Sequence, residues 1–169
     1  MHTCFQPVSY KSELHLSLLN KVFNVDKSKW VPYYNFKALL LSKTFIDQDP
    51  FLRDLGKKRK FMAGLLEVSP GTVYNWHTDT DRQCSLNMLV YDGGRSMCLF
   101  APEGEQLVMP VVELSYKPNT YYAFNTRIPH TVINLSGPRY MFSLEFIEED
   151  YGLTYDELLS DIKELDYGL

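Results

Sequence analysis

Short apolar runs separated by turn residues dominate the chain from Phe61 onward. The runs span residues 61–68, 72–76, 84–91, 96–100, 106–114, 120–124, 130–135 and 139–147. Most are closed by glycine, proline or asparagine, and eight short strands spaced in this way predict a β-sandwich, barrel or jelly roll. Asp92-Gly93-Gly94, between the third and fourth runs, predicts a tight β-hairpin.

The N-terminal part of the chain, up to residue 60, has a mixed pattern. The leucines between residues 14 and 19, with Val22 and Phe23, fall at helical spacing, although the leucines at 14, 16 and 18 also alternate. The apolar stretch 36–46 fits either a helix or a strand. Asp47-Gln48-Asp49-Pro50 then predicts a break, because the residue before a proline avoids the helical conformation.

The C-terminal residues predict a helix over 153–166. Thr154 and Glu157 have the spacing of a capping box at its start. One apolar stripe follows, formed by Tyr155, Leu158, Leu159, Ile162 and Leu165. Such a stripe packs on the outside of the β region. We therefore expect one mainly β domain over 1–169, with an N-terminal extension (1–60), a β core (61–148) and this C-terminal helix.

Composition narrows the class of protein. Of the 169 residues 45% are hydrophobic, and the twelve tyrosines, ten phenylalanines and two tryptophans favour strands. Nothing in the net charge of −4 argues for nucleic acid or an anionic membrane as partner, and neither is expected. Cys4, Cys84 and Cys98 form no C-x-x-C pair, so reduced, buried thiols are expected. Without the apolar run of a signal peptide or the roughly 20 apolar residues of a membrane span, the expected location is cytoplasmic.

The candidate chemistry concentrates in His77-Thr78-Asp79 and in His130, which hold two of the four histidines. Residues two apart on an extended segment point to the same face, so His77 and Asp79 can bind one ion. His130 opens a later predicted strand, and in an eight-stranded jelly roll it reaches the same open end. Two imidazoles and one carboxylate are the ligands of non-haem iron(II) in oxygenases. We predict that these three residues bind iron.

Arg139 follows His130 by nine residues and starts the next predicted strand. Alternation places Arg139 and Ser143 on one face of that strand and larger apolar side chains on the other. A charged side chain entering a mostly apolar strand requires a partner, and a bound dicarboxylate supplies one through a bidentate pair. Asn87 and Tyr74 are further candidates for polar groups that line this cavity and bind the cosubstrate.

Other interpretations of these residues stay open. Asp79-Thr80-Asp81 is also compatible with a solvated loop, and Asp81 is an alternative carboxylate ligand. The basic run Lys57-Lys58-Arg59-Lys60 is typical of a solvated loop, with contact to an anionic substrate or nucleic acid as the alternative. Cys84 and Cys98 are expected to pack in the interior rather than to bind metal.

The H-x-D…H pattern, with an arginine nine residues after the distal histidine, resembles the 2-oxoglutarate/Fe(II)-dependent oxygenase superfamily over residues 61–148. Residues 68–79 and 130–139 are similar to its prolyl-hydroxylase-like and aspartyl/asparaginyl β-hydroxylase-like branches. The resemblance implies a double-stranded β-helix, a cupin-like jelly roll, with Fe(II) on His77, Asp79 and His130 and 2-oxoglutarate on Arg139. It also implies that O2 and 2-oxoglutarate are consumed in hydroxylating a protein side chain or a small molecule, with succinate as product and ascorbate as a candidate reductant.

The sequence departs from this pattern at two positions. Glu145 stands where AlkB-like nucleic-acid demethylases carry a second arginine, which argues against nucleic-acid repair. Met141 stands where other branches have serine in an R-x-S pair. Two further function classes stay open: a cupin-like metalloenzyme without 2-oxoglutarate, against which only Arg139 argues, and a non-enzymatic jelly-roll binding module. Loops over 48–60 and 92–95 are expected to select the substrate.

Overall fold

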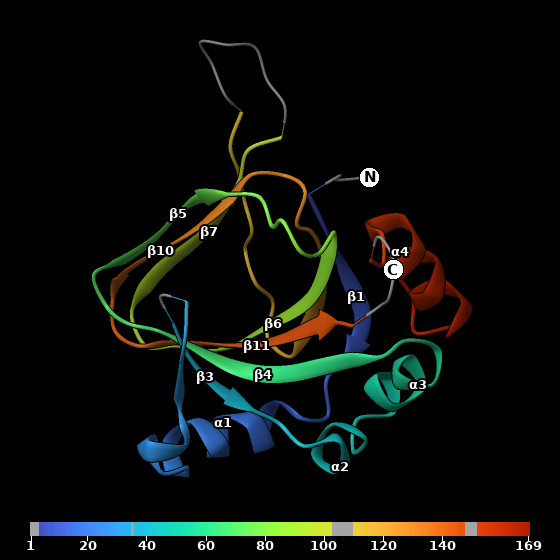
Figure 1. Ribbon diagram of the computed structural model, residues 1–169, viewed down its shortest axis with the longest axis horizontal. Helices are drawn as coiled ribbons and strands as arrows, with labels where there is room; N and C mark the ends of the chain where they lie inside the picture. The colour runs from blue at the N-terminus through green and yellow to red at the C-terminus, as the bar shows by residue number, and fades with distance from the viewer. Residues whose placement is uncertain (1–3, 35, 103–109, 148–151) are drawn as a thin grey trace.

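The computed structural model describes residues 4–34, 36–102, 110–147 and 152–169. Over these residues the protein is mainly β, with antiparallel sheets of seven and four strands and helices toward both ends of the chain (Figure 1). The strands are β1 (Phe5–Lys11), β2 (Val31–Tyr33), β3 (Phe36–Leu40), β4 (Phe61–Val68), β5 (Thr72–His77), β6 (Cys84–Asp92), β7 (Arg95–Phe100), β8 (Val112–Glu113), β9 (Thr120–Asn125), β10 (His130–Ser136) and β11 (Arg139–Phe146). The helices are α1 (His15–Asn24), α2 (Lys43–Ile46), α3 (Pro50–Lys58) and α4 (Tyr155–Glu164), with a short 3-10 turn at Lys27–Lys29. This confirms the predicted jelly roll with flanking helices.

The central strand of the larger sheet is β11. The order of that sheet is β1-β9-β6-β11-β4-β3-β2, and the order of the smaller sheet is β5-β10-β7-β8. Arg139 at the start of β11 lies opposite Val68 of β4 and Asp92 of β6. Because β6 and β7 lie in different sheets, and so do β10 and β11, the chain crosses between the sheets at both connecting turns. The predicted hairpin at Asp92-Gly93-Gly94 is therefore wrong: this turn joins two sheets.

The two crossing turns pack against each other, which explains their glycines. Gly93 N donates a hydrogen bond to Pro138 O at 2.9 Å. A Cβ on Gly94 would lie 2.0 Å from Ser136 O, and Gly137 has a φ of 70°, a conformation that glycine adopts readily. Arg139 follows directly after the second of these turns.

Two apolar cores lie on the two sides of the larger sheet. The outer core contains side chains of α1, α3 and α4 packed on the sheet, including Tyr140, Phe142 and Leu144 of β11. The inner core lies between the sheets and contains Cys4, Cys98, Phe100, Leu114, Tyr122, Phe124 and Val132. The Arg139 side chain lies on the opposite face of β11 from Tyr140, Phe142 and Leu144. There it lines a cavity between the sheets together with Cys98 of β7, which agrees with the predicted alternation.

The larger sheet is not confined to residues 61–148. β1 pairs with β9, and β3 pairs with both β4 and β2, so three strands come from the segment expected as an extension. The helix predicted from residue 14 is confirmed as α1, with Leu18 and Val22 buried. The ambiguous stretch 36–46 contains both a strand and a helix, β3 and α2, because Ser42 caps α2 by accepting a hydrogen bond from Phe45 N.

The predicted break at 47–50 is confirmed: α2 ends at Ile46, Asp49 is extended, and a new helix, α3, begins at Pro50. The Asp49 side chain accepts a hydrogen bond from Leu52 N, and Pro50 occupies the first turn of α3, where a missing N–H costs nothing. Phe51, Leu52 and Leu55 are fully buried beneath it. The expected substrate-selecting loop over 48–60 is wrong for residues 50–58, which form α3.

The basic run at 57–60 joins two helices. Lys58 pairs with Glu164, and Arg59 Nε lies 2.6 Å from Asp161 Oδ2, so the end of α3 is tied to α4. The capping box of Thr154 and Glu157 at the start of α4 is present as predicted.

The predicted strand 106–114 is described only in part. Its residues 106–109 lie outside the described part of the chain, and the remainder contains β8. Within the described ranges, no helix is long and apolar enough to cross a membrane.

Candidate metal centre and cosubstrate pocket

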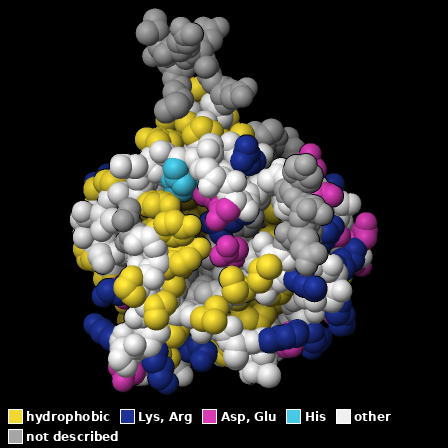
Figure 2. All heavy atoms as spheres, in the orientation of Figure 1, with side chains coloured by type: hydrophobic (Ala, Val, Ile, Leu, Met, Phe, Trp, Pro, Cys, Tyr) yellow, Lys and Arg dark blue, Asp and Glu magenta, His cyan; other side chains and the backbone are white. Residues whose placement is uncertain are grey.

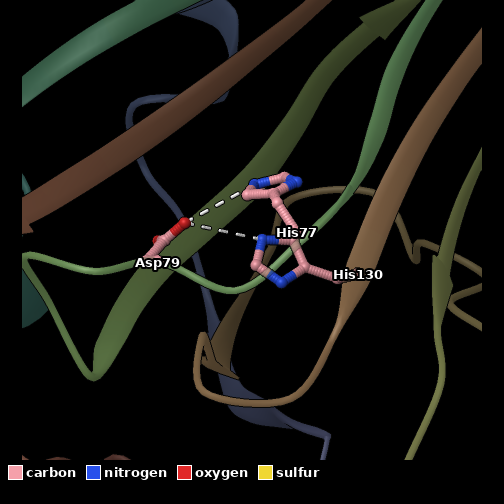
Figure 3. Close-up of side chains that lie close together, drawn as sticks. All are labelled: His77, Asp79 and His130. Atoms are coloured by element: carbon pink, nitrogen blue, oxygen red, sulfur yellow. Dashed lines mark ion pairs between the residues drawn. The ribbon is translucent and has the colours of Figure 1, made fainter.

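His77, Asp79 and His130 come together where β5 ends and β10 begins (Figure 3). Asp79 Oδ1 lies 3.5 Å from His77 Nε2 and 3.9 Å from His130 Nε2. Two atoms bound to one ion at about 2.1 Å lie no more than about 4.2 Å apart, so both distances already fit a shared metal ion. In the described part of the chain, this is the group of His, Cys, Asp and Glu whose ligand atoms converge, all within 4.8 Å of one another.

Backbone pairing places the two histidines side by side. His77 ends β5, His130 begins β10, and the two residues are opposite each other in the ladder. Asp79 lies in the following loop, where its N–H donates to Thr126 O at 3.0 Å. Thr126 Oγ1 donates to Arg82 O at 2.9 Å, so Thr126, which is buried, holds both ends of the segment that carries Asp79.

The second nitrogen of each ring fixes which atom faces the centre. His77 Nδ1 lies 2.7 Å from Asn75 O, and His130 Nδ1 lies 2.9 Å from Ile128 O. A carbonyl oxygen only accepts, so each Nδ1 carries the proton when the ring is neutral. Both Nε2 lone pairs are then directed toward Asp79 Oδ1, as metal-binding histidines require.

The protonation states suit cation binding. Burial alone would raise the pKa of Asp79, but the His77 hydrogen bond and the charge of Arg82 outweigh it and lower the pKa to about 2. Burial lowers the pKa of His130 below its ordinary value. For His77, burial lowers the pKa, but the bonds to Asp79 and to the Asn75 carbonyl outweigh it and leave the pKa raised. The site thus holds an ionised carboxylate beside a neutral imidazole at pH 7.

Arg82 is a site residue that the sequence interpretation missed. Its Nε donates to Asp79 Oδ2, while Oδ1 faces the two histidines. Asp81, the alternative carboxylate, is exposed and is not part of the converging group. The Arg127 side chain completes the surroundings by donating from Nη1 to Asp79 O at 3.2 Å.

Arg139 lies in a second pocket between the sheets. Its side chain is 1% exposed, and its Nη1 donates to Ser96 Oγ, whose own proton goes to Asp92 Oδ2 at 2.7 Å. The guanidinium carbon lies 5.2 Å from the centre of the Tyr116 ring. These side chains line a cavity of about 270 Å³. A buried cation beside an open cavity is suited to binding an anion.

The guanidinium has bonding capacity left for such a ligand. Arg139 Nε is buried and has no hydrogen-bond partner among the described residues. Buried donors are normally satisfied, so an unpartnered one marks a site where a ligand or water is bound. Asp92 does not neutralise the arginine directly, because its oxygens accept from Ser96 Oγ and Gly94 N.

Strand register relates this pocket to the triad. His130 lies opposite Phe100 on β7, and Asn134 lies opposite Ser96, the partner of Arg139. Four residues of strand span about 13 Å between backbones. A five-carbon dicarboxylate together with the His130 and Arg139 side chains can bridge this length. The residues therefore fit a cosubstrate that contacts both the metal and the arginine.

Of the two further cosubstrate candidates, Tyr74 lies next to the triad and Asn87 is buried on β6. The Tyr74 ring packs edge-on against His77, with centroids 4.2 Å apart, so Tyr74 is part of the wall around the triad. Asn87 is buried on β6, where its Nδ2 donates to Ser85 Oγ at 2.7 Å. Neither belongs to the residues that line the cavity at Arg139, and their cosubstrate contacts stay predictions.

Comparison with known proteins gives the fold. No family model and no curated protein matches the sequence. A prolyl-4-hydroxylase from Pseudomonas putida matches with a TM-score of 0.64 and 13% identity, over 86% of this chain and 91% of that chain. A prolyl hydroxylase from Trichoplax adhaerens, in complex with a hypoxia inducible factor oxygen degradation domain peptide fragment, matches with a TM-score of 0.61 and 15% identity, over 93% and 86%.

A third solved structure has a different activity. The non-heme alpha-ketoglutarate-dependent epimerase of nogalamycin biosynthesis matches with a TM-score of 0.59 and 13% identity, over 85% of this chain and 77% of that chain. At these identities the similarity concerns the fold. The chain has the fold of 2-oxoglutarate/Fe(II) oxygenases, as the sequence resemblance predicts, and its reaction has to be argued from its own site.

Proposed function

We propose that the protein is a 2-oxoglutarate- and Fe(II)-dependent dioxygenase that hydroxylates a protein side chain or a small molecule. One observation carries the proposal: His77 Nε2, His130 Nε2 and Asp79 Oδ1 converge, and four residues along the β7–β10 pairing lies a pocket that holds the buried, incompletely bonded Arg139. The fold shared with oxygenases supports it.

The donor set fits Fe(II). Two imidazoles and one carboxylate on one side of an ion leave further coordination positions open for a cosubstrate and oxygen. When bound, the metal and 2-oxoglutarate supply oxidative chemistry in which 2-oxoglutarate and O2 yield succinate, carbon dioxide and one oxygen atom for the substrate. The protein supplies ligand geometry, orientation and a dry cavity.

The side chains of this chain have separate tasks in that scheme. The Asn75 and Ile128 carbonyls hold the ring orientation of His77 and His130. Arg139, positioned by Ser96, binds the far carboxylate of 2-oxoglutarate. Phe100, whose ring lies 5.7 Å from that of His130 and is nearly parallel to it, excludes water from the inner side of the site.

The proposal is favoured over the other function classes by Arg139. A metalloenzyme without 2-oxoglutarate needs no cation buried to 1% exposure in a cavity of about 270 Å³. A non-enzymatic binding module needs neither this cation nor two histidines with fixed tautomers. Hydroxylation is proposed rather than epimerisation because two of the similar structures are hydroxylases.

An anaerobic titration of the purified protein tests the cofactors. Addition of Fe(II) and then 2-oxoglutarate is expected to produce a weak visible charge-transfer band, and admission of O2 is expected to yield succinate. Metal binding without the band and without succinate would favour the metalloenzyme that does not use 2-oxoglutarate. Absence of metal binding would favour the binding module.

A further inference from the structure

Beside the triad, the face of the larger sheet that carries Ser143 continues over β4 and β3 to the edge strand β2. Register places Leu40, Gly64 and Ser143 in one row and Met62 beside Glu145 in the next, so these side chains share a face. They line a hollow of about 270 Å³ whose walls also include Val31 and Leu66. We call it the Gly64 groove, because the glycine in the middle of the row leaves its floor open.

The groove is apolar and open to solvent. Leu40 is 70% exposed, Val31 54% and Met62 45%, which is unusual for large apolar side chains that lie close together. Figure 2 shows hydrophobic side chains gathered on this face, below histidine and acidic side chains at the open end of the sheets. Contiguous exposed apolar surface of this kind marks an interaction site.

The shape suits an extended chain better than an enclosed small molecule. Pockets that bury most of a small ligand usually measure about 300–1,000 Å³ and surround it. The Gly64 groove is smaller than that range and lies open, and it continues into a second hollow of about 310 Å³ that shares Leu40, Met62 and Ala63. Two hollows in line accommodate successive side chains of one extended segment.

The end of this surface near the triad carries acidic side chains. Near the triad lie Glu145, which accepts from the Tyr33 hydroxyl at 3.2 Å, and the exposed Asp81. Arg82 is also there, but its charge is paired with Asp79. The second hollow is lined by Lys60, by Lys43, which is paired with Asp47, and by Arg59, which is paired with Asp161. A segment with a basic residue toward the metal centre complements this arrangement.

We propose that the Gly64 groove binds an extended polypeptide segment, with an apolar side chain over Gly64 and a lysine or arginine side chain beside Glu145. This inference names the substrate class of the oxygenase proposed above and rests on that function.

Gly64 gives a direct test, because the groove can be filled there without disturbing the sheet. A Cβ at this position would lie 3.4 Å from Leu39 O, at the edge of ordinary contact, and the position needs no positive φ. Gly64→Leu is thus expected to fold and to occupy the floor. Leu40→Asp removes an apolar wall, and Leu16→Asp is its matched control, since Leu16 is 76% exposed on α1.

The probe is a phage-displayed library of random 12-residue peptides, selected on the wild-type protein. Enriched peptides are expected to carry an apolar residue within three positions of a lysine or arginine. One such peptide, made synthetically, is expected to bind Gly64→Leu and Leu40→Asp at least tenfold more weakly than wild type and Leu16→Asp. Glu145→Lys is expected to lose the basic peptide and to gain affinity for its lysine-to-glutamate counterpart, a gain that a misfolded protein does not show.

The inference is overturned if no peptide is enriched, if enriched peptides bind Gly64→Leu as tightly as wild type, or if Glu145→Lys leaves the charge preference unchanged. The same preparations are titrated with Mn(II) and 2-oxoglutarate. Binding of both without peptide enrichment overturns the groove and leaves the proposed oxygenase standing. Peptide binding without metal binding overturns the oxygenase, and with it the assignment of the peptide as substrate.

Discussion

The carboxylate of Asp79 is divided between two partners: Arg82 donates from Nε to Oδ2, and Oδ1 faces the Nε2 atoms of His77 and His130. Arg82 is three residues after Asp79, and its own carbonyl is held by Thr126. The arginine therefore orients the carboxylate so that one oxygen is presented to a metal ion and the other is already occupied. Partners of this kind fix metal ligands in one geometry.

Arg82→Ala is expected to weaken Fe(II) or Mn(II) binding about 10- to 100-fold, the usual effect of removing a group that orients a ligand. Arg82→Lys keeps the charge but not the planar donor, so it restores only part of the affinity. Isothermal titration with Mn(II) measures this. Arg53→Ala, on α3, is the control and leaves metal affinity unchanged. Wild-type affinity in Arg82→Ala would show that Thr126 alone positions Asp79.

Replacement of any triad residue by alanine is expected to abolish metal binding and turnover. Each of His77, Asp79 and His130 supplies one of three ligand atoms, and the remaining two hold the ion poorly. Asp81→Ala is the matched control for Asp79→Ala, and it is expected to have little effect because Asp81 is exposed. Metal content after dialysis gives the answer, and full metal content in Asp79→Ala would reassign the carboxylate.

Arg139→Ala is expected to weaken 2-oxoglutarate binding far more than metal binding. Loss of a charge-assisted hydrogen bond to a carboxylate costs about 1.5–3 kcal/mol, which corresponds to roughly 10- to 150-fold in affinity. Titration of the Mn(II)-loaded protein with 2-oxoglutarate measures it. Arg95→Ala, an exposed arginine on β7, serves as control. Equal losses for metal and 2-oxoglutarate would indicate general damage to the fold.

The central strands were predictable because both periodicity and turn residues mark them. Predicted runs 61–68 and 139–147 match β4 and β11 almost residue for residue, since each alternates or is fully buried between turns. The edge strand β2 is too short to show a period, and β1 contains a proline. The sequence of a turn also does not show whether the strands on its two sides pair with each other. Asp92-Gly93-Gly94 has the residues of a tight hairpin, but it connects strands of different sheets.

The candidate site also contains some residues that the sequence indicates and others that it does not. His77 and Asp79 are two residues apart on an extended segment, so the sequence alone indicates that they act together. Ser96 and Tyr116 contact Arg139 only because β7 and the segment after β8 face the start of β11, and no local pattern indicates this. Arg82 could have been predicted from the sequence. It is a cation three residues after the candidate ligand Asp79, and residues at this spacing often form a local ion pair.

Gly94→Ala and Gly56→Ala form a pair of glycine substitutions with opposite expected effects on stability. At Gly94 the new Cβ would lie 2.0 Å from Ser136 O, so the two crossing turns have to separate. The expected cost is about 3 kcal/mol, at the upper end for overpacking. At Gly56, inside α3, the nearest atom is Phe61 Cζ at 3.6 Å, and alanine is expected to stabilise the helix by about 0.5–1 kcal/mol.

Thermal unfolding separates the two outcomes. For a chain of this size 1 kcal/mol shifts Tm by about 2–4 °C, so Gly94→Ala is expected to lower Tm by roughly 6–12 °C and Gly56→Ala to raise it by a few degrees. Because the separated turns precede Arg139 and Ser96, Gly94→Ala is also expected to weaken 2-oxoglutarate binding at temperatures where the protein stays folded, whereas Gly56→Ala leaves it unchanged. A stable Gly94→Ala with normal 2-oxoglutarate affinity would show that the contact between the turns does not position the pocket.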